Sequence, residues 1–245
     1  MAVSQTAIGP VAHTERETSS AAGVSAYARM AGFGLLFALA SIVVLYGGSG
    51  ALAGTRPDNA TDASSVAAFY NHPALAFLFW QAVLSVIGIA FFALAFRRYL
   101  NGFAARPLSR QLADLGVALA LIEVPVAVVE FGLQLSLVRL AGLGDASLLG
   151  VFMAWDWIDN GTMPWLEFAW LGALSLAAWT CGALPRWLAG YGLVVSVLLL
   201  VMAVPGLLLQ YPIGVALGAY VPWMIWFLVT GIYLARGGRA PATSA

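Results

Sequence analysis

Arg110–Leu140 reads RQLADLGVALALIEVPVAVVEFGLQLSLVRL, and this stretch decides the fold. Its apolar part exceeds the roughly 20 residues that a helix needs to cross a bilayer. Two glutamates, Glu123 and Glu130, lie inside that apolar part. An ionisable side chain in a membrane-spanning helix is costly in free energy, so it usually faces the protein interior and often marks function. Because successive helix residues are rotated by about 100°, a spacing of seven places both glutamates on one face.

The composition of the whole chain is that of a membrane protein. Of its 245 residues 62% are hydrophobic and 9% are charged, whereas soluble domains are about 25% charged. The mean hydropathy is +0.90. The 11 basic residues are all arginine and balance 11 acidic residues, which argues against nucleic acid as a partner. A single cysteine, Cys181, excludes an intrachain disulfide and a multi-cysteine metal site.

Six apolar segments of about 20 residues predict an all-α fold, a polytopic bundle of six transmembrane helices. Short turns make the last three spans antiparallel neighbours. Polar residues without periodicity predict disordered tails at 1–26 and 237–245. Ala51–Ala53 resembles a signal-peptidase site, but the preceding polar region is too long for a signal peptide, which favours a retained first span. The expected spans are 27–47, 74–96, 112–135, 163–181, 187–209 and 213–234.

A shorter segment at 146–157 is too interrupted to span. Its apolar residues, among them Phe152 and Trp155, suit an amphipathic helix that lies at the membrane interface. Asp159–Thr162 follows with residues typical of turns and helix caps, so the sequence predicts a turn before the fourth span.

The arginines predict the orientation. With the N-terminus inside, nine of the 11 arginines lie on the cytoplasmic side, and only Arg56 and Arg139 lie outside. Positive residues gather on the cytoplasmic side of membrane proteins. We therefore expect both termini in the cytoplasm. Arginine without lysine, together with frequent alanine, glycine, leucine and valine, indicates a bacterial chain and hence the inner membrane.

The acidic residues predict an outward-facing site. Glu130 and Glu167 each lie about four residues, or about 6 Å, inside the outer end of their spans, and Glu123 lies near mid-depth. The outer surface above them carries Asp156, Asp159 and His72. We expect an acidic funnel with one histidine and no basic residue inside the membrane. No catalytic, cofactor-binding or metal-ligating residue and no cofactor are predicted.

Three functions remain open on this evidence. In the first, the protein is not catalytic and the buried glutamates are protonated, with hydrogen bonds to polar groups of other helices. In the second, the carboxylates serve a small proton- or cation-coupled transporter. In the third, a membrane enzyme uses a glutamate as acid or base on a lipid-like substrate, although no nucleophile accompanies the acids. The expected partners are the bilayer and a small cation or apolar ligand. No oligomeric state is indicated.

A stretch near the C-terminus resembles a bacterial membrane family. The segment GALPRWLAGYGLVVSVLLLVMAV at Gly182–Val204, with its Leu184-Pro185-Arg186 turn, resembles the corresponding region of the six-helix family catalogued as domain of unknown function 4386. The preceding FAWLGALSLAAW and the acid at Glu123 are similar too. Family members often carry a polar or basic residue one turn before that acid, where this chain has Ala120. The resemblance implies a six-helix fold and no particular activity.

Overall fold

The computed structural model describes residues 11–57, 62–103, 107–208 and 213–240, which contain helices and no strand. Five of these helices are long and apolar enough to cross a membrane, namely α1, α3, α4, α7 and α8. The all-α fold is thus confirmed, and the apolar helices indicate a multi-pass membrane protein. The elements are α1 (Val11–Ala53), α2 (Ala63–Tyr70), α3 (Ala74–Asn101), α4 (Pro107–Leu143), α5 (Leu148–Asp156), the π-helix η1 (Trp157–Thr162), α6 (Met163–Cys181), α7 (Arg186–Leu208) and α8 (Ile213–Ala235).

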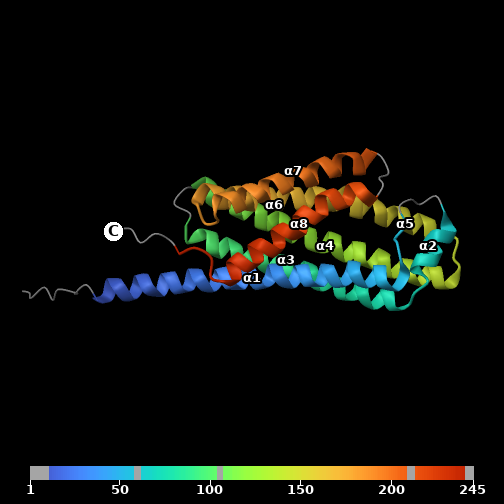
Figure 1. Cartoon of the computed structure of the whole chain (residues 1–245), viewed down its shortest axis with the longest axis horizontal. Coiled ribbons are helices and arrows are strands. Elements are labelled where there is room, and N and C mark those ends of the chain that lie inside the picture. Colours follow the sequence, from blue (N-terminus) through green and yellow to red (C-terminus); the bar gives the residue numbers. More distant parts are fainter. Residues whose placement is uncertain (1–10, 58–61, 104–106, 209–212, 241–245) are drawn as a thin grey trace, which may run out of the picture.

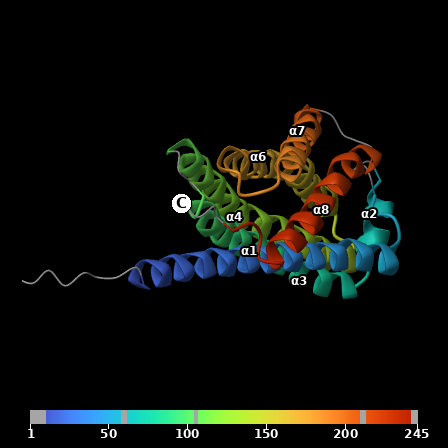
Figure 2. The same ribbon diagram turned by 60° about the vertical axis from the view of Figure 1, so that its left-hand side comes forward.

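Six helices form a closed ring. Each packs on the next in the order α1, α3, α4, α6, α7, α8, and α8 returns to α1 (Figures 1 and 2). Glycines bring α1 close to both neighbours. A Cβ atom at Gly32 would lie 2.2 Å from the backbone nitrogen of Ala235, and one at Gly34 would lie 2.9 Å from that of Phe92. Small residues are what allow apolar helices to approach this closely.

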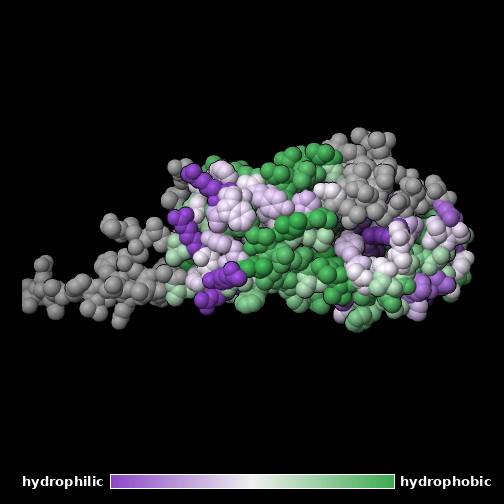
Figure 3. All heavy atoms as spheres, viewed as in Figure 1, coloured by the Kyte–Doolittle hydropathy of each residue, from purple (hydrophilic) through white to green (hydrophobic). Residues whose placement is uncertain are grey.

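The outer surface of the ring is apolar. Figure 3 shows a hydrophobic band across the middle of one face, with hydrophilic residues gathered at both ends of the molecule. Large side chains such as Phe77, 72% exposed, and Phe33, 62% exposed, face outward. Soluble monomers rarely expose continuous apolar surface of this extent, so the band is the surface that meets lipid.

The first helix begins earlier than the sequence predicts. Residues 1–26 are expected to be disordered, but α1 is helical from Val11, and its first turns extend beyond the other helices (Figure 2). The reason is that extending an existing helix needs no new nucleus, so alanine-rich residues before a span continue it readily. The turn predicted at 210–212 lies outside the described residues, as do residues 1–10 and 241–245.

The turn predicted at Asp159–Thr162 is wrong. Here α5, η1 and α6 follow one another without a break, and η1 continues the helix in π geometry (Figure 1). The side-chain amide of Asn160 donates to the Asp156 carboxylate four residues earlier, 2.8 Å away, a contact typical of a continuing helix. The segment predicted as a separate interfacial helix therefore extends α6 instead, and its nine residues in α5 are too few to span.

Aromatic side chains fix the end of the molecule where α2 and α5 lie. The Tyr70 ring is at the centre, with ring centroids 5.0 Å from Phe69, 6.0 Å from Phe79 and 6.3 Å from Phe152. Asp62 caps α2 by accepting a hydrogen bond from the backbone N–H of Ser64 at 2.9 Å. Through these contacts α2 and α5 pack on each other and on α4. This end contains the candidate site.

Candidate functional site

A cavity of about 350 Å³ lies inside the ring near α2 and η1. Its walls come from the last turns of α1 and from α3, α4, α6 and α8. Figure 3 shows a hollow with a hydrophilic floor at this end of the molecule. The volume falls in the range of about 300–1,000 Å³ that is usual for sites of small molecules.

All three glutamates of the spans line this cavity, and all are buried. Glu123 is 1% exposed, while Glu130 and Glu167 are each 5% exposed. Their partners differ. The indole N–H of Trp170 donates a short hydrogen bond to Glu123 from α6, and Gln134 approaches Glu130 at 3.4 Å from the next turn of α4. One oxygen of Glu167, Oε2, is buried and has no hydrogen-bond partner among the residues that the structure describes.

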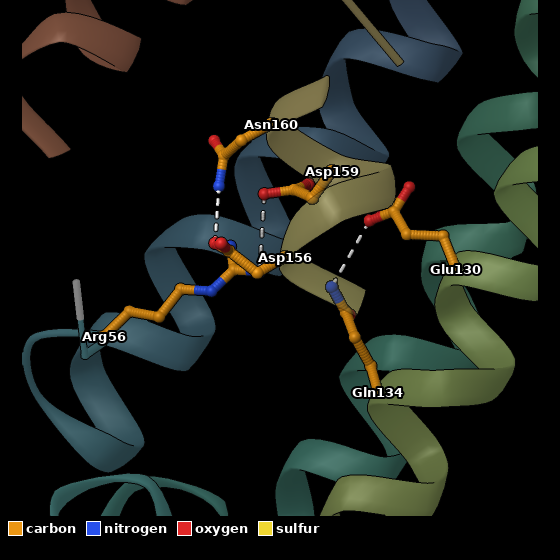
Figure 4. A network of polar contacts seen from close by, with 6 residues as sticks. All are labelled: Arg56, Glu130, Gln134, Asp156, Asp159 and Asn160. Carbon is orange, nitrogen blue, oxygen red and sulfur yellow. Dashed lines mark hydrogen bonds and ion pairs between the residues drawn. The ribbon is translucent and has the colours of Figure 1, made fainter. Parts of the chain in front are cut away.

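The π-helix adds two aspartates to the same cavity. Asp156 precedes η1, Asp159 lies within it, and both line the cavity together with Asn160. Figure 4 shows that the three side chains come from this one short segment, with Glu130 and Gln134 on the facing α4. Short π segments inside α-helices are frequent at functional sites, because the wider turn changes the direction in which side chains point.

A basic side chain from outside the membrane-spanning segments reaches the predicted acidic funnel. Arg56, just after α1, extends toward η1, and its Nη2 atom lies 3.6 Å from Oδ2 of Asp159 (Figure 4). The guanidinium carbon also lies 3.7 Å from the centroid of the Trp155 ring, well within the range of a cation–π interaction. The side chains of Arg56 and Asp159 are only 21% and 14% exposed. The guanidinium is therefore held between an acid and an aromatic face.

The charges of the polar groups outside the spans follow from their surroundings. Burial alone would lower the pKa of Arg56, but Asp159, Tyr70, Tyr46 and Glu130 together outweigh it and raise the pKa, so the guanidinium stays charged. Burial raises the pKa of Asp156 above its ordinary value, while the Asn160 hydrogen bond lowers it and the charge of Asp159 raises it further. Asp156 thus takes up a proton more readily than an aspartate in water does.

The remaining walls are apolar and aromatic. Ile42 and Leu45 of α1, Val86 and Ile89 of α3, and Phe131 of α4 supply aliphatic and aromatic surface. Tyr220 and Trp223 of α8 also line the cavity, and the buried indole N–H of Trp223 has no hydrogen-bond partner in the described part of the chain. A site with mostly apolar walls and a few polar atoms suits a small amphiphilic molecule.

The structure places five of the six predicted site residues around one cavity. The exception is His72, which is exposed at the end of α2 and does not line it. Within the described part of the chain, no three His, Cys, Asp or Glu residues are grouped so that they could hold a metal ion.

Sequence reasoning missed Arg56, Trp155 and Trp223 as members of the site. For Trp155 the sequence predicts only a place at the membrane interface, and for Arg56 only a position in the outer loop. No local pattern identifies Arg56, because its partner Asp159 is distant in sequence and the contact depends on the continuous helix through η1. Comparison of the chain with protein-family models, with curated proteins and with solved structures gives no match.

Proposed function

We propose that this protein binds a small organic cation in its outward-facing cavity and exchanges it for protons, as a small cation-coupled transporter. The observation that supports this most is the charge of the cavity lining. Its described residues include five carboxyl groups and one guanidinium, that of Arg56. Glu123, Glu130 and Glu167 are the buried ones, and because Arg56 pairs with Asp159, a proton or a cation is needed to neutralise these three carboxyl groups.

The chemistry of the walls favours an organic cation over a metal ion. Metal ions of the hard type need several oxygen ligands converging at short distance, and the described acids are not grouped in that way. The aliphatic surface of α1 and α3 and the rings of Trp155, Tyr220 and Trp223 suit an apolar cation instead. Aromatic faces attract such cations by about 0.5–2 kcal/mol each.

The glutamates have different roles in this proposal. Glu123 is the structural one, because its hydrogen bond from Trp170 joins α4 to α6 within the ring. Glu167 is the ligand-binding one, because its free oxygen faces the cavity and nothing in the described protein satisfies it. A buried hydrogen-bond acceptor in a folded protein normally has a donor partner. We therefore take a bound molecule to supply the donor for Glu167.

The six-span topology is part of the proposal. Besides the five apolar helices, α6 is a member of the closed ring between α4 and α7, and its 19 residues are close to the length that crosses the hydrocarbon. α6 is not among those five helices, and its 19 residues include Glu167 and three tryptophans. With nine of 11 arginines on one side, both termini lie in the cytoplasm of a bacterial inner membrane and the cavity faces outward. A six-helix layout of this kind is also what the resemblance to domain of unknown function 4386 implies.

A transport assay tests the function. The purified protein is reconstituted into liposomes with an acidic lumen, the membrane potential is clamped at zero, and uptake of tetraethylammonium is measured. We expect uptake above that of protein-free liposomes, abolished by collapsing the pH gradient and by the double variant Glu130→Gln/Glu167→Gln. Asp145→Asn, which removes an exposed acid outside the cavity, is the matched control and should transport normally. Uptake equal to that of empty liposomes would overturn the proposal.

A further inference from the structure

The environment of Arg56 is itself a binding site for a cation. Its guanidinium lies over the Trp155 ring at 3.7 Å and beside Asp159 at 3.6 Å, and the Glu130 side chain lines the same cavity. An aromatic face and carboxylates in a partly buried site are the groups by which proteins recognise organic cations. The Arg56 guanidinium thus occupies a position at which the proposed function requires a cation from outside the protein.

The ion pair between Arg56 and Asp159 is longer than a direct hydrogen bond. The distance from Nη2 to Asp159 is 3.6 Å, and among the described residues this buried atom has no hydrogen-bond partner. A free guanidinium, which is not tethered to the backbone, can approach the carboxylate and the ring at closer distances. The segment that carries Arg56 begins at Gly54, whose φ of 79° is a conformation that favours glycine.

A second observation, an unpaired hydrogen-bond acceptor, points to a ligand in the cavity next to this site. Glu167 lines the same cavity and is 5% exposed, and no described residue forms a hydrogen bond with its Oε2 atom. A planar guanidinium presents five N–H donors and stacks on aromatic faces, so it matches both the unsatisfied acceptor and the Trp155 ring better than a compact ammonium does.

We infer that the cavity binds guanidinium compounds, and that Arg56 is a tethered competitor which occupies the cation site until such a ligand displaces it. This inference rests on the proposed function, because it takes the carboxylates to bind an external cation. It adds the chemical class of the ligand and a residue that weakens the binding of that ligand.

Chemical rescue tests the inference in the purified full-length protein. Arg56→Ala removes the tethered cation and should lower Tm. Guanidinium chloride at low millimolar concentration should restore Tm in a saturable manner, because a ligand that binds only the folded state stabilises it. Equal concentrations of urea and sodium chloride should not restore it. Arg139→Ala removes an exposed arginine and is the matched control, with no rescue expected.

Competition provides the second measurement. Methylguanidine should bind Arg56→Ala at least tenfold more tightly than the unaltered protein, and Arg56→Gln replaces Arg56→Ala if the latter does not fold. Equal affinity for both proteins, or rescue by urea as effective as by guanidinium, would overturn the inference. Rescue without any tetraethylammonium transport would overturn the proposed function alone, and transport without rescue would overturn only the role of Arg56.

Discussion

Glu123 and Glu167 show how one residue type serves two purposes in the same cavity. Both are almost fully buried, yet Trp170 donates to Glu123 while the Oε2 atom of Glu167 has no partner. The sequence predicts that Glu123 and Glu130 share a face, because a spacing of seven residues brings side chains to the same side of a helix. It cannot predict their partners, because these come from another helix or from a ligand.

Replacing each glutamate by methionine should have opposite effects on stability. Glu123→Met leaves the buried indole N–H of Trp170 without an acceptor and should reduce the free energy of unfolding by about 1–3 kcal/mol. Glu167→Met removes an unsatisfied acceptor and should raise Tm while abolishing cation binding. Thermal unfolding followed by tryptophan fluorescence measures both. A large loss of stability in Glu167→Met would mean that Glu167 has a structural partner.

The aspartates outside the spans predict the dependence of stability on pH. Burial raises the folded-state pKa of Asp156, so its favourable contribution is present at low pH and is lost as pH rises from about 4 through the raised value. Asp156→Asn should therefore reduce the loss of Tm over that range.

Asp62 is the control with the opposite pH dependence. Its hydrogen bonds from Ser64 lower its pKa, so its contribution is lost as pH falls through the lowered value. Identical pH profiles for the unaltered protein and Asp156→Asn would contradict this account.

Helices were predicted better than their ends. The fourth predicted span, 163–181, has the same bounds as α6, although α6 is not among the five described helices that hydropathy marks as able to cross a membrane. The turn before it was predicted wrongly, because Asp, Asn, Gly and Thr favour turns locally, whereas packing of α5 and η1 on α4 keeps this segment helical. The helical start of α1 was missed for a related reason, since a polar composition does not reveal that an adjacent helix will be extended.

Glycine contacts between helices give a prediction at the scale of the element. A methyl group at Gly32 meets the backbone of α8, with Gly231 O at 2.7 Å, and neither helix can yield without shifting. Gly32→Ala should therefore destabilise the protein by about 1–3 kcal/mol. Gly47→Ala on the same helix meets nothing within 4 Å and should be neutral or stabilising by up to about 1 kcal/mol. Equal Tm values for the two variants would show that α1 and α8 are not in this contact.

For the whole molecule, composition predicts the membrane class and the helical fold, but not the order of the ring. The outward faces of the helices are all apolar, so the sequence does not show that α1 lies between α3 and α8. It also does not show that Arg56 reaches η1, which requires α1 and α6 to be placed relative to each other. The contents of the cavity are therefore a property of the assembled ring.

The orientation of the ring is a prediction at the same scale. Because nine of 11 arginines lie on the proposed cytoplasmic side, reporter fusions after Gly102 and after Ala240 should both report the cytoplasm. A fusion after Asp62 should report the exterior. An external signal from the fusion after Gly102 would place the cavity on the cytoplasmic side and reverse the proposed direction of access.

Binding of tetraethylammonium, measured by calorimetry in two buffers of different ionisation enthalpy at neutral pH, tests the central claim most directly. The claim is that carboxyl groups in the cavity exchange protons for an organic cation. We expect saturable binding accompanied by the release of about one proton for each cation, since a buried carboxyl must lose its proton to pair with the ligand. Glu167→Gln should weaken the binding at least tenfold, or about 1.4 kcal/mol, while Asp145→Asn leaves it unchanged. Absence of binding, or equal binding by the unaltered protein and Glu167→Gln, would contradict the account.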